Sequence, residues 1–121
     1  MVVLEDLAGL DYCYLSTTGR VSGQLREIEI WFGVSGGTVY MLAGGGEHAH
    51  WVRNIRQRPD VSVRIGDRRL QGKGRVVDAP SEEDALARRL LLGKYSPGYD
   101  GDLADWGKTA LAVAVDLALV E

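Results

Sequence analysis

The chain has 121 residues, of which 45% are apolar and 26% are charged, and its formal net charge is −3. This length suits one domain with a single core, so we expect residues 1–121 to form one unit. The composition argues against a disordered chain, and no apolar run approaches the roughly 18 residues of a membrane span. The first ten residues carry two acids where a signal peptide would carry Lys or Arg, so we expect no stable membrane insertion and a cytoplasmic location.

The charges are unevenly distributed along the chain. An acidic protein is a poor candidate for nucleic-acid binding, which requires an excess of Lys and Arg, so we expect no nucleic-acid partner. The basic side chains nevertheless gather before residue 76: Arg20, Arg26, Arg53, Arg56, Arg58, Arg64, Arg68, Arg69, Lys73 and Arg75. This asymmetry fits either a small anionic ligand held by the first two thirds of the chain or a solvated basic face. The single cysteine, Cys13, excludes an internal disulfide and is expected to fill the core.

Alternating apolar and polar residues predict six strands. The last of these runs places bulky residues on one face and alanines on the other, as the wall of a small barrel requires. Short Gly-containing turns join several of the runs, which favours antiparallel hairpins. The predicted strands are Tyr12–Ser16, Arg26–Phe32, Thr38–Ala43, Val61–Ile65, Arg68–Val77 and Ala110–Leu119.

Two helices are predicted between the strands. The first covers Glu47–Gln57, where His48, Trp51, Val52 and Ile55 form an apolar stripe. The second follows Pro80, with Ser81 as N-cap, acids in its first turn and Gly93 near its end. The sequence therefore predicts an α+β fold that is mainly β, a six-stranded antiparallel barrel, closed or nearly closed, with two inserted helices.

The first two strands are joined by the stretch TTGRVSG, residues 17–23. Hydroxyls and a guanidinium are suitable donors to a phosphate, and two glycines permit a backbone that turns its N–H groups toward an anion. Arg26, at the start of the next strand, can close on the same anion. The stretch is not a Walker loop, because no Gly-Lys-Ser/Thr follows. It is either an anion site or an unusually polar hairpin turn.

A second motif, AGGGEHAHWVRN, spans residues 43–54. Gly44, Gly46 and Ala49 match the dinucleotide fingerprint G-x-G-x-x-A, with Asp67 about 20 residues further on. The short turns between strands contradict that interpretation, because parallel strands need crossover connections. The alternative is that the glycines let a flat ring lie against bare backbone while the next helix presents His48, His50, Trp51 and Asn54.

Residues of that helix allow more than one role. Trp51 is either a core residue or a ligand platform, and the Asn54 amide needs a partner in the backbone or in a ligand. His48 and His50 are two residues apart and point in different directions on a helix, so we predict no metal site. No nucleophile motif is present. Further along the chain, Tyr95, Tyr99 and Trp106 lie in a segment interrupted by Gly and Pro, and form either an aromatic lid over a pocket or a cover for the barrel end.

Three stretches together resemble the deazaflavin (F420)-dependent nitroreductase family of split β-barrel flavin and deazaflavin oxidoreductases: YLSTTGRVSGQLREIEIWF, VYMLAGGGEHAHWVRNIRQRPDVSVRI and the closing β-run. The resemblance implies an FMN-binding split barrel-like fold. It also implies coenzyme F420, an 8-hydroxy-5-deazaflavin with a ribityl phosphate and an oligoglutamate tail. Its reduced form would transfer hydride to a small unsaturated, quinone or nitro compound.

The resemblance also implies a set of cofactor-binding residues. The hairpin residues Thr18, Arg20, Ser22, Gly23, Gln24 and Arg26 would hold the phosphate and the acidic tail. Ala43, Gly44 and Gly45 would lie along the ring, and His50, Trp51 and Asn54 would line the ring and ribityl side. His50, Tyr99 or solvent would supply a proton, and the site would lie in a homodimer.

Two departures from the family pattern leave FMN open as the alternative cofactor. Val21 stands where relatives commonly carry Lys or Arg, and the glycine run replaces a lysine often found there. Two other functions also remain open at this point. One is a non-catalytic binder of a flavin, deazaflavin or lipid-like ligand, and the other is an FMN-dependent oxidase of the pyridoxamine-phosphate oxidase type.

Overall fold

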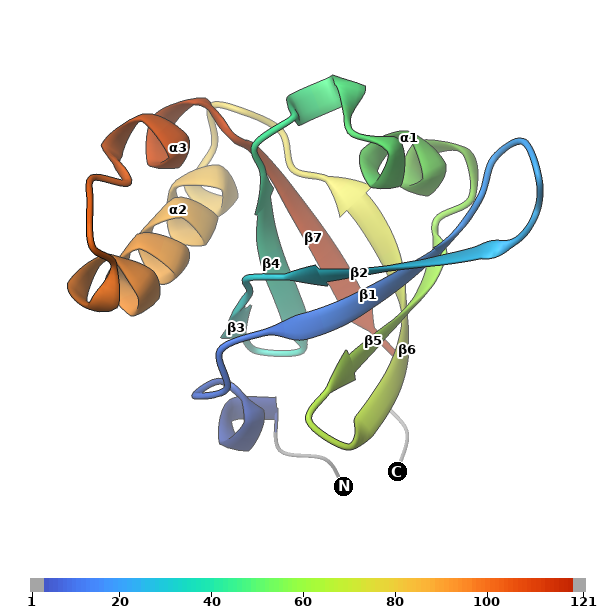
Figure 1. Cartoon of the computed structure of the whole chain (residues 1–121), viewed down its shortest axis with the longest axis horizontal. Coiled ribbons are helices and arrows are strands. Elements are labelled where there is room, and N and C mark those ends of the chain that lie inside the picture. Colours follow the sequence, from blue (N-terminus) through green and yellow to red (C-terminus); the bar gives the residue numbers. More distant parts are fainter. Residues whose placement is uncertain (1–3, 119–121) are drawn as a thin grey trace.

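A seven-stranded antiparallel sheet, curled into a half-barrel, forms the body of the protein (Figure 1). The computed structural model describes residues 4–118. Across the sheet the strands follow the order β2-β1-β5-β6-β7-β4-β3, and every pairing is antiparallel. The strands are β1 (Cys13–Thr18), β2 (Leu25–Ile30), β3 (Gly33–Ser35), β4 (Thr38–Ala43), β5 (Asp60–Ile65), β6 (Arg68–Val76) and β7 (Leu111–Leu117). This topology excludes the dinucleotide fold and agrees with the expected split barrel.

The predicted strand count of six is wrong, because a short strand that was not predicted, β3, precedes β4 and pairs with it, and the predicted run Arg26–Phe32 ends early. Strand β2 ends at Ile30, and a separate strand β3 begins at Gly33. Between them, the Phe32 N–H donates to the Tyr95 hydroxyl (3.0 Å) and the Phe32 carbonyl accepts from Lys94 Nζ (3.1 Å). The backbone of Phe32 therefore bonds to side chains of a distant helix rather than to a neighbouring strand. The predicted strand Thr38–Ala43 has the bounds of β4, the other four runs form strands whose ends are shifted, and Leu119 lies outside the described residues.

The predicted helices are present, with a corrected start for the first of them and one additional helix. The helices are α1 (His50–Gln57), α2 (Glu82–Tyr95) and α3 (Ala104–Thr109), with short 3-10 turns at Leu4–Leu7, Gly46–His48 and Ser96–Gly98. Ala49 is extended (φ −62°, ψ 132°), so the predicted helix from Glu47 begins only at His50, and His48 is not on the apolar stripe. Val52 and Ile55 are buried as predicted. Within residues 4–118 no helix is long and apolar enough to span a membrane.

Helix α2 begins where the sequence predicts, and its contacts explain the unpredicted α3. The Ser81 hydroxyl accepts from the Asp84 N–H (3.0 Å) as N-cap. Arg88 of α2 pairs with Asp84 and donates to the Gly107 carbonyl (2.9 Å) in α3. A Cβ at Gly107 would lie 2.7 Å from Leu92 Cδ1, so the two helices approach at a point that only glycine allows.

The core lies on both faces of the sheet. On β7, Val113 and Val115 point into the barrel with Leu15, Phe32 and other buried side chains. Ala112 and Ala114 point outward, where their small size lets α2 pack closely through Leu91 and other apolar residues. The predicted bulky and small faces of this strand are therefore confirmed. Cys13 is fully buried, and burial raises the pKa of its thiol to about 12, as expected for a core residue rather than a reactive one.

A charged cluster ties β6, β7 and α2 together on the outside. The Arg75 guanidinium donates to both oxygens of Glu83 (2.7 Å each) and to Asp116 (2.7 Å to Oδ2). The Tyr40 hydroxyl donates to Glu83 Oε2 (2.7 Å). These bonds hold the pKa of Glu83 and Asp116 below their ordinary values, chiefly because Arg75 stabilises the charged carboxylates.

This cluster predicts an acid-dependent part of the stability. Because the pKa of Glu83 and Asp116 is lower in the folded chain, the unfolded chain binds more protons as the pH falls from about 5 to about 3, and the free energy of unfolding decreases. The change Arg75→Met should make this decrease shallower, by less than about 1 kcal/mol for each exposed pair. Urea denaturation at several pH values measures it. An unchanged pH slope in Arg75→Met, with Arg69→Met as control, would contradict the account.

Candidate functional site

A pocket lies between the β1–β2 hairpin and helix α1, which are neighbours in Figure 1. We call it the hairpin pocket. Its volume is about 770 Å³. Strand β1, the turn and strand β2 form one wall, and the first turns of α1 form the other. The lining residues are Thr17, Gly19, Arg20, Val21, Ser22, Arg26, Glu27, Ile28, His50, Trp51 and Asn54.

Asn54 holds the two walls of the hairpin pocket together. Its side chain is on α1 and is 3% exposed. Its Oδ1 accepts from the Arg20 backbone N–H (3.2 Å) and from Arg20 Nη1 (2.9 Å), and its Nδ2 donates to Thr17 Oγ1 (3.1 Å). The hydrogen-bond partners that this buried amide needs are therefore in the hairpin. Asn54 fixes the position of Arg20 as well as lining the pocket.

His50 makes a second contact to the same arginine. Arg20 Nη2 lies 3.3 Å from His50 Nδ1. A guanidinium can only donate, so Nδ1 accepts and the proton of the neutral imidazole is on Nε2. Arg20 is thus held from two successive turns of α1, at His50 and Asn54. A guanidinium with a fixed orientation loses little freedom when it binds an anion.

The turn between the strands has a compact backbone that its glycines make possible. The Gly19 N–H donates to the Gln24 carbonyl (2.7 Å), and the Gly23 N–H donates to the Gly19 carbonyl (2.8 Å). Gly23 has a φ of +74°, and a Cβ at Gly19 would lie 2.8 Å from Ser22 Oγ. The Ser22 hydroxyl accepts from the Gln24 N–H (3.2 Å). The turn is therefore ordered by its own bonds before any ligand is present.

The pocket carries two basic side chains that no carboxylate neutralises. Several other basic residues of the first two thirds of the chain do have acidic partners: Arg56 pairs with Glu47, Lys73 with Asp60 and Arg75 with Glu83 and Asp116. Within residues 4–118, no ion pair is formed by Arg20 or Arg26. Several other arginines of this region form no ion pair there either: Arg53, Arg58, Arg64, Arg68 and Arg69. Arg20 and Arg26 differ from them in lining the hairpin pocket, where the Ser22 hydroxyl and one carboxylate, that of Glu27, also lie. Two guanidinium groups and a hydroxyl in one pocket are suited to an anion.

The structure brings together some of the predicted site residues and separates others. Arg20, Ser22, Arg26, His50, Trp51 and Asn54 share the hairpin pocket. Thr18, Gly23 and Gln24 belong to the same hairpin but do not line the pocket. None of Ala43, Gly44 and Gly45 lines the pocket: Ala43 is the buried last residue of β4, and the two glycines that follow it are exposed. Trp51 packs against the core and also lines the pocket, and its role as a ligand platform stays a prediction.

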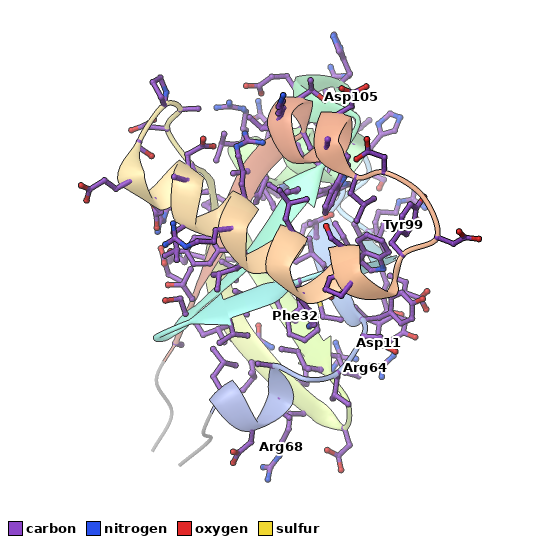
Figure 2. The ribbon with its side chains drawn as sticks, turned by 90° about the vertical axis from the view of Figure 1, so that its left-hand side faces the viewer. Asp11, Phe32, Arg64, Arg68, Tyr99 and Asp105 are labelled. Carbon is purple, nitrogen blue, oxygen red and sulfur yellow. The ribbon has the colours of Figure 1, made fainter. Side chains whose placement is uncertain are left out.

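A second pocket, of about 570 Å³, lies at the other end of β2. We call it the aromatic pocket. It is bounded by β2, by the end of β4 and by the segment from Tyr99 to α3, on which Figure 2 labels Tyr99 and Asp105. The lining residues are Tyr12, Glu29, Ile30, Trp31, Leu42, Tyr99, Asp102, Leu103, Asp105 and Trp106.

The three aromatic residues of the predicted lid have different roles. Tyr95 is buried, stacks on Trp31 (ring centroids 4.3 Å apart) and bonds the backbone near Phe32, so it supports the fold. Burial raises the pKa of Tyr95 to about 12. Tyr99 and Trp106 meet Trp31 edge to face, at 5.9 Å and 5.5 Å between centroids, and both line the aromatic pocket. Sequence reasoning missed Trp31. The signal that could have found it is a tryptophan on the same face of the predicted second strand as Glu27 and Glu29.

The chain belongs to a family of reductases. The model of the family described as F420H(2)-dependent quinone reductase matches residues 2–118, nearly the whole chain. The resemblance inferred from the three sequence stretches is thereby confirmed, and so is the prediction of an F420H2-dependent reductase.

Solved structures support this assignment. The chain is similar to an F420-H2 dependent reductase, FDR-A, with 25% sequence identity and a TM-score of 0.70, over 86% of this chain and 92% of that one. It is also similar to a protein described as a domain-swapped dimer, with 26% identity and a TM-score of 0.70, over 88% and 81% of the two chains. HutZ, the heme storage protein of Vibrio cholerae, shares the fold alone, with 12% identity and a TM-score of 0.77 over 97% and 89%.

The contacts of Asn54 predict what its removal does. The change Asn54→Ala leaves the Thr17 hydroxyl and the Arg20 N–H without their partner and should lower the free energy of unfolding by about 1–3 kcal/mol. Hydrogen exchange at the Arg20 amide should become faster. The exposed neighbour Arg53→Ala is the control, with an expected change within about 0.5 kcal/mol. Unchanged protection of the Arg20 amide in Asn54→Ala would be incompatible with this role.

Proposed function

We propose that the hairpin pocket binds the phosphate end of coenzyme F420 and that the chain uses the reduced cofactor to reduce a quinone or another small unsaturated or nitro compound. The observation that carries the proposal is the Arg20 guanidinium, held by Asn54 and His50 and without an ion-pair partner in the described part of the chain. A phosphate accepts two parallel bonds from such a group. Arg26 and Ser22 add a second charge and a hydroxyl in the same pocket.

The ring of the cofactor would extend from the hairpin pocket over α1 toward the end of β4. Three features support this path. Trp51 lines the pocket with an apolar surface, and Gly44 and Gly45 are exposed at the end of β4. A Cβ at Gly44 would meet only Trp106, at 3.8 Å from Cδ1, so the bare backbone leaves room for a flat ring. Ala43, Gly44 and Gly45 would then offer backbone groups to its polar edge.

The protein's contribution to the reaction is position and exclusion of water. When bound, reduced F420 supplies the hydride, and this chemistry belongs to the cofactor. Arg20, Arg26 and Ser22 would hold the phosphate end, and Trp51 would exclude water from one side, so that donor and acceptor meet in near-attack geometry. His50 is our proposed proton donor, because its imidazole lines the hairpin pocket and histidine is the side chain that most often transfers a proton in catalysis. Tyr99, in the aromatic pocket, is the second candidate.

The exposed apolar residues of the hairpin offer no charge to the oligoglutamate tail. Val21 is 93% exposed and Leu25 is 74% exposed, and neither carries a charge. We therefore propose that the pocket recognises the phosphate more than the tail. We also propose a homodimer, supported by the similar domain-swapped dimer and by these exposed apolar side chains. Light scattering of the purified chain tests the dimer, and the cytoplasmic location stays a prediction.

Titration with F420 and with FMN tests the cofactor assignment. We expect F420 to bind with micromolar affinity, measured by its fluorescence. Arg20→Ala should weaken binding by about 10- to 100-fold, because a fixed charge-assisted bond to the phosphate is lost. Arg68→Ala, at the start of β6 and outside the pocket, is the matched control and should bind normally. Binding unaffected by Arg20→Ala would remove the phosphate role, and preference for FMN would favour the pyridoxamine-phosphate oxidase type.

Turnover separates an enzyme from a non-catalytic binder. We expect the chain with reduced F420 under anaerobic conditions to oxidise the cofactor when a quinone is added, with the absorbance of oxidised F420 as the readout. A nitroarene and an enone, offered in parallel, define the substrate class. His50→Gln places an amide oxygen near Arg20 as an acceptor but cannot transfer a proton. It should therefore lower kcat more than it changes the affinity for the cofactor. Tight binding of reduced F420 without oxidation by any of the acceptors would instead indicate a binder.

A further inference from the structure

The proposed cofactor path leaves the aromatic pocket without a ligand of its own. The two pockets share strand β2: Arg26, Glu27 and Ile28 line the hairpin pocket, and Glu29, Ile30 and Trp31 line the aromatic pocket. The exposed Gly44, on the proposed ring path, faces Trp106 of the aromatic pocket. A molecule in the aromatic pocket would therefore lie beside the region where we place the ring.

The aromatic pocket offers ring surface in a concave setting. Trp31 and Trp106 are half-buried, so part of each indole is accessible, and Tyr12 and Tyr99 are 46% and 45% exposed. Tyr95 holds Trp31 in place by stacking at 4.3 Å with ring planes 3° apart. Fixed aromatic side chains around a hollow of this size are suited to a planar ligand, because flat surfaces stack with little loss of side-chain freedom.

The charged residues that line the aromatic pocket are all acidic. Three carboxylates line it, those of Glu29, Asp102 and Asp105, and none of its lining residues is basic. Glu29 accepts from the Tyr14 hydroxyl (2.8 Å) and Asp102 accepts from the Ala104 N–H (2.8 Å), so both are oriented by neutral donors that leave their charge in place. Within residues 4–118, Asp105 forms no ion pair. The neighbouring hairpin pocket has the opposite character, with Arg20 and Arg26.

We infer that the aromatic pocket binds a planar organic cation, and that it admits cationic or neutral ring compounds as acceptors while it disfavours anionic ones. The faces of Trp and Tyr attract a cation through their quadrupoles, and the negatively charged carboxylates attract it as well. An anionic ring would meet only repulsion there and would be drawn to the hairpin pocket. The binding preference needs nothing from the cofactor, whereas its role in choosing acceptors rests on the proposed function.

Calorimetric titration of the full chain, without cofactor, tests the preference with three probes that share one ring system: 1-methylquinolinium, quinoline and quinoline-2-carboxylate. We expect the cation to bind most tightly and the anion most weakly, with roughly a tenfold difference in Kd between these two. Asp105→Asn should weaken cation binding roughly threefold or more and leave quinoline unchanged. Asp67→Asn, the same change in the β5–β6 turn, is the matched control and should leave all three affinities unchanged.

Two results would overturn the inference. One is a cation that binds no more tightly than quinoline, and the other is an unchanged cation affinity in the double variant Glu29→Gln, Asp105→Asn. Tyr99→Leu, at a position that is 45% exposed, removes ring surface from the aromatic pocket and should weaken the binding of all three ligands. Failure of the probe order while F420 still binds counts against this inference alone. Failure of F420 binding with the probe order kept counts against the proposed function alone.

Discussion

The amide of Asn54 is the contact on which the arrangement of the site depends. It is one of few polar side chains that are buried within residues 4–118, and the hydrogen bonds of its side chain go to the hairpin, at Thr17 and Arg20. A buried amide without partners is costly, so its bonds fix helix α1 against the hairpin in one register. The same bonds orient Arg20, and His50 one turn earlier completes its support. A structural requirement of the core thereby creates a positively charged pocket with a preset geometry.

The distribution of charge in the folded chain differs from its distribution along the sequence. The basic excess before residue 76 suggested either an anionic ligand or a solvated basic face. Three of these residues, Arg56, Lys73 and Arg75, are paired with acids, two of which come from the last third of the chain. Within residues 4–118, the guanidinium groups of the hairpin residues Arg20 and Arg26 form no ion pair. Strand β2 contributes Arg26 and Glu27 to the hairpin pocket, where Arg20 adds a second positive charge, and Glu29 to the aromatic pocket, whose charged residues are all acidic. Two ligands of opposite charge can thus be placed side by side by one strand.

Much of the fold was predictable because its signals are local. Alternating side chains fixed the faces of β7, and the polar turn at residues 17–23 identified the hairpin that bears Arg20. The parts that were missed depend on contacts between distant residues. The break after β2 depends on the Tyr95 hydroxyl, 63 residues from Phe32, and α3 depends on the approach of Gly107 to α2. Of the aromatic pocket, the segment with Tyr99 and Trp106 was predicted as one of two alternatives, and Trp31 was missed because it meets Trp106 only in the folded chain.

The central claim is that the oriented Arg20 guanidinium receives the phosphate of the deazaflavin cofactor. A crystal structure of the chain with F420 bound tests this most directly. The account predicts a phosphate oxygen about 3 Å from a guanidinium nitrogen of Arg20, with the Asn54 bond to Arg20 preserved and the ring lying toward Gly44. A phosphate located in the aromatic pocket, or an Arg20 side chain turned away from the ligand, would contradict it.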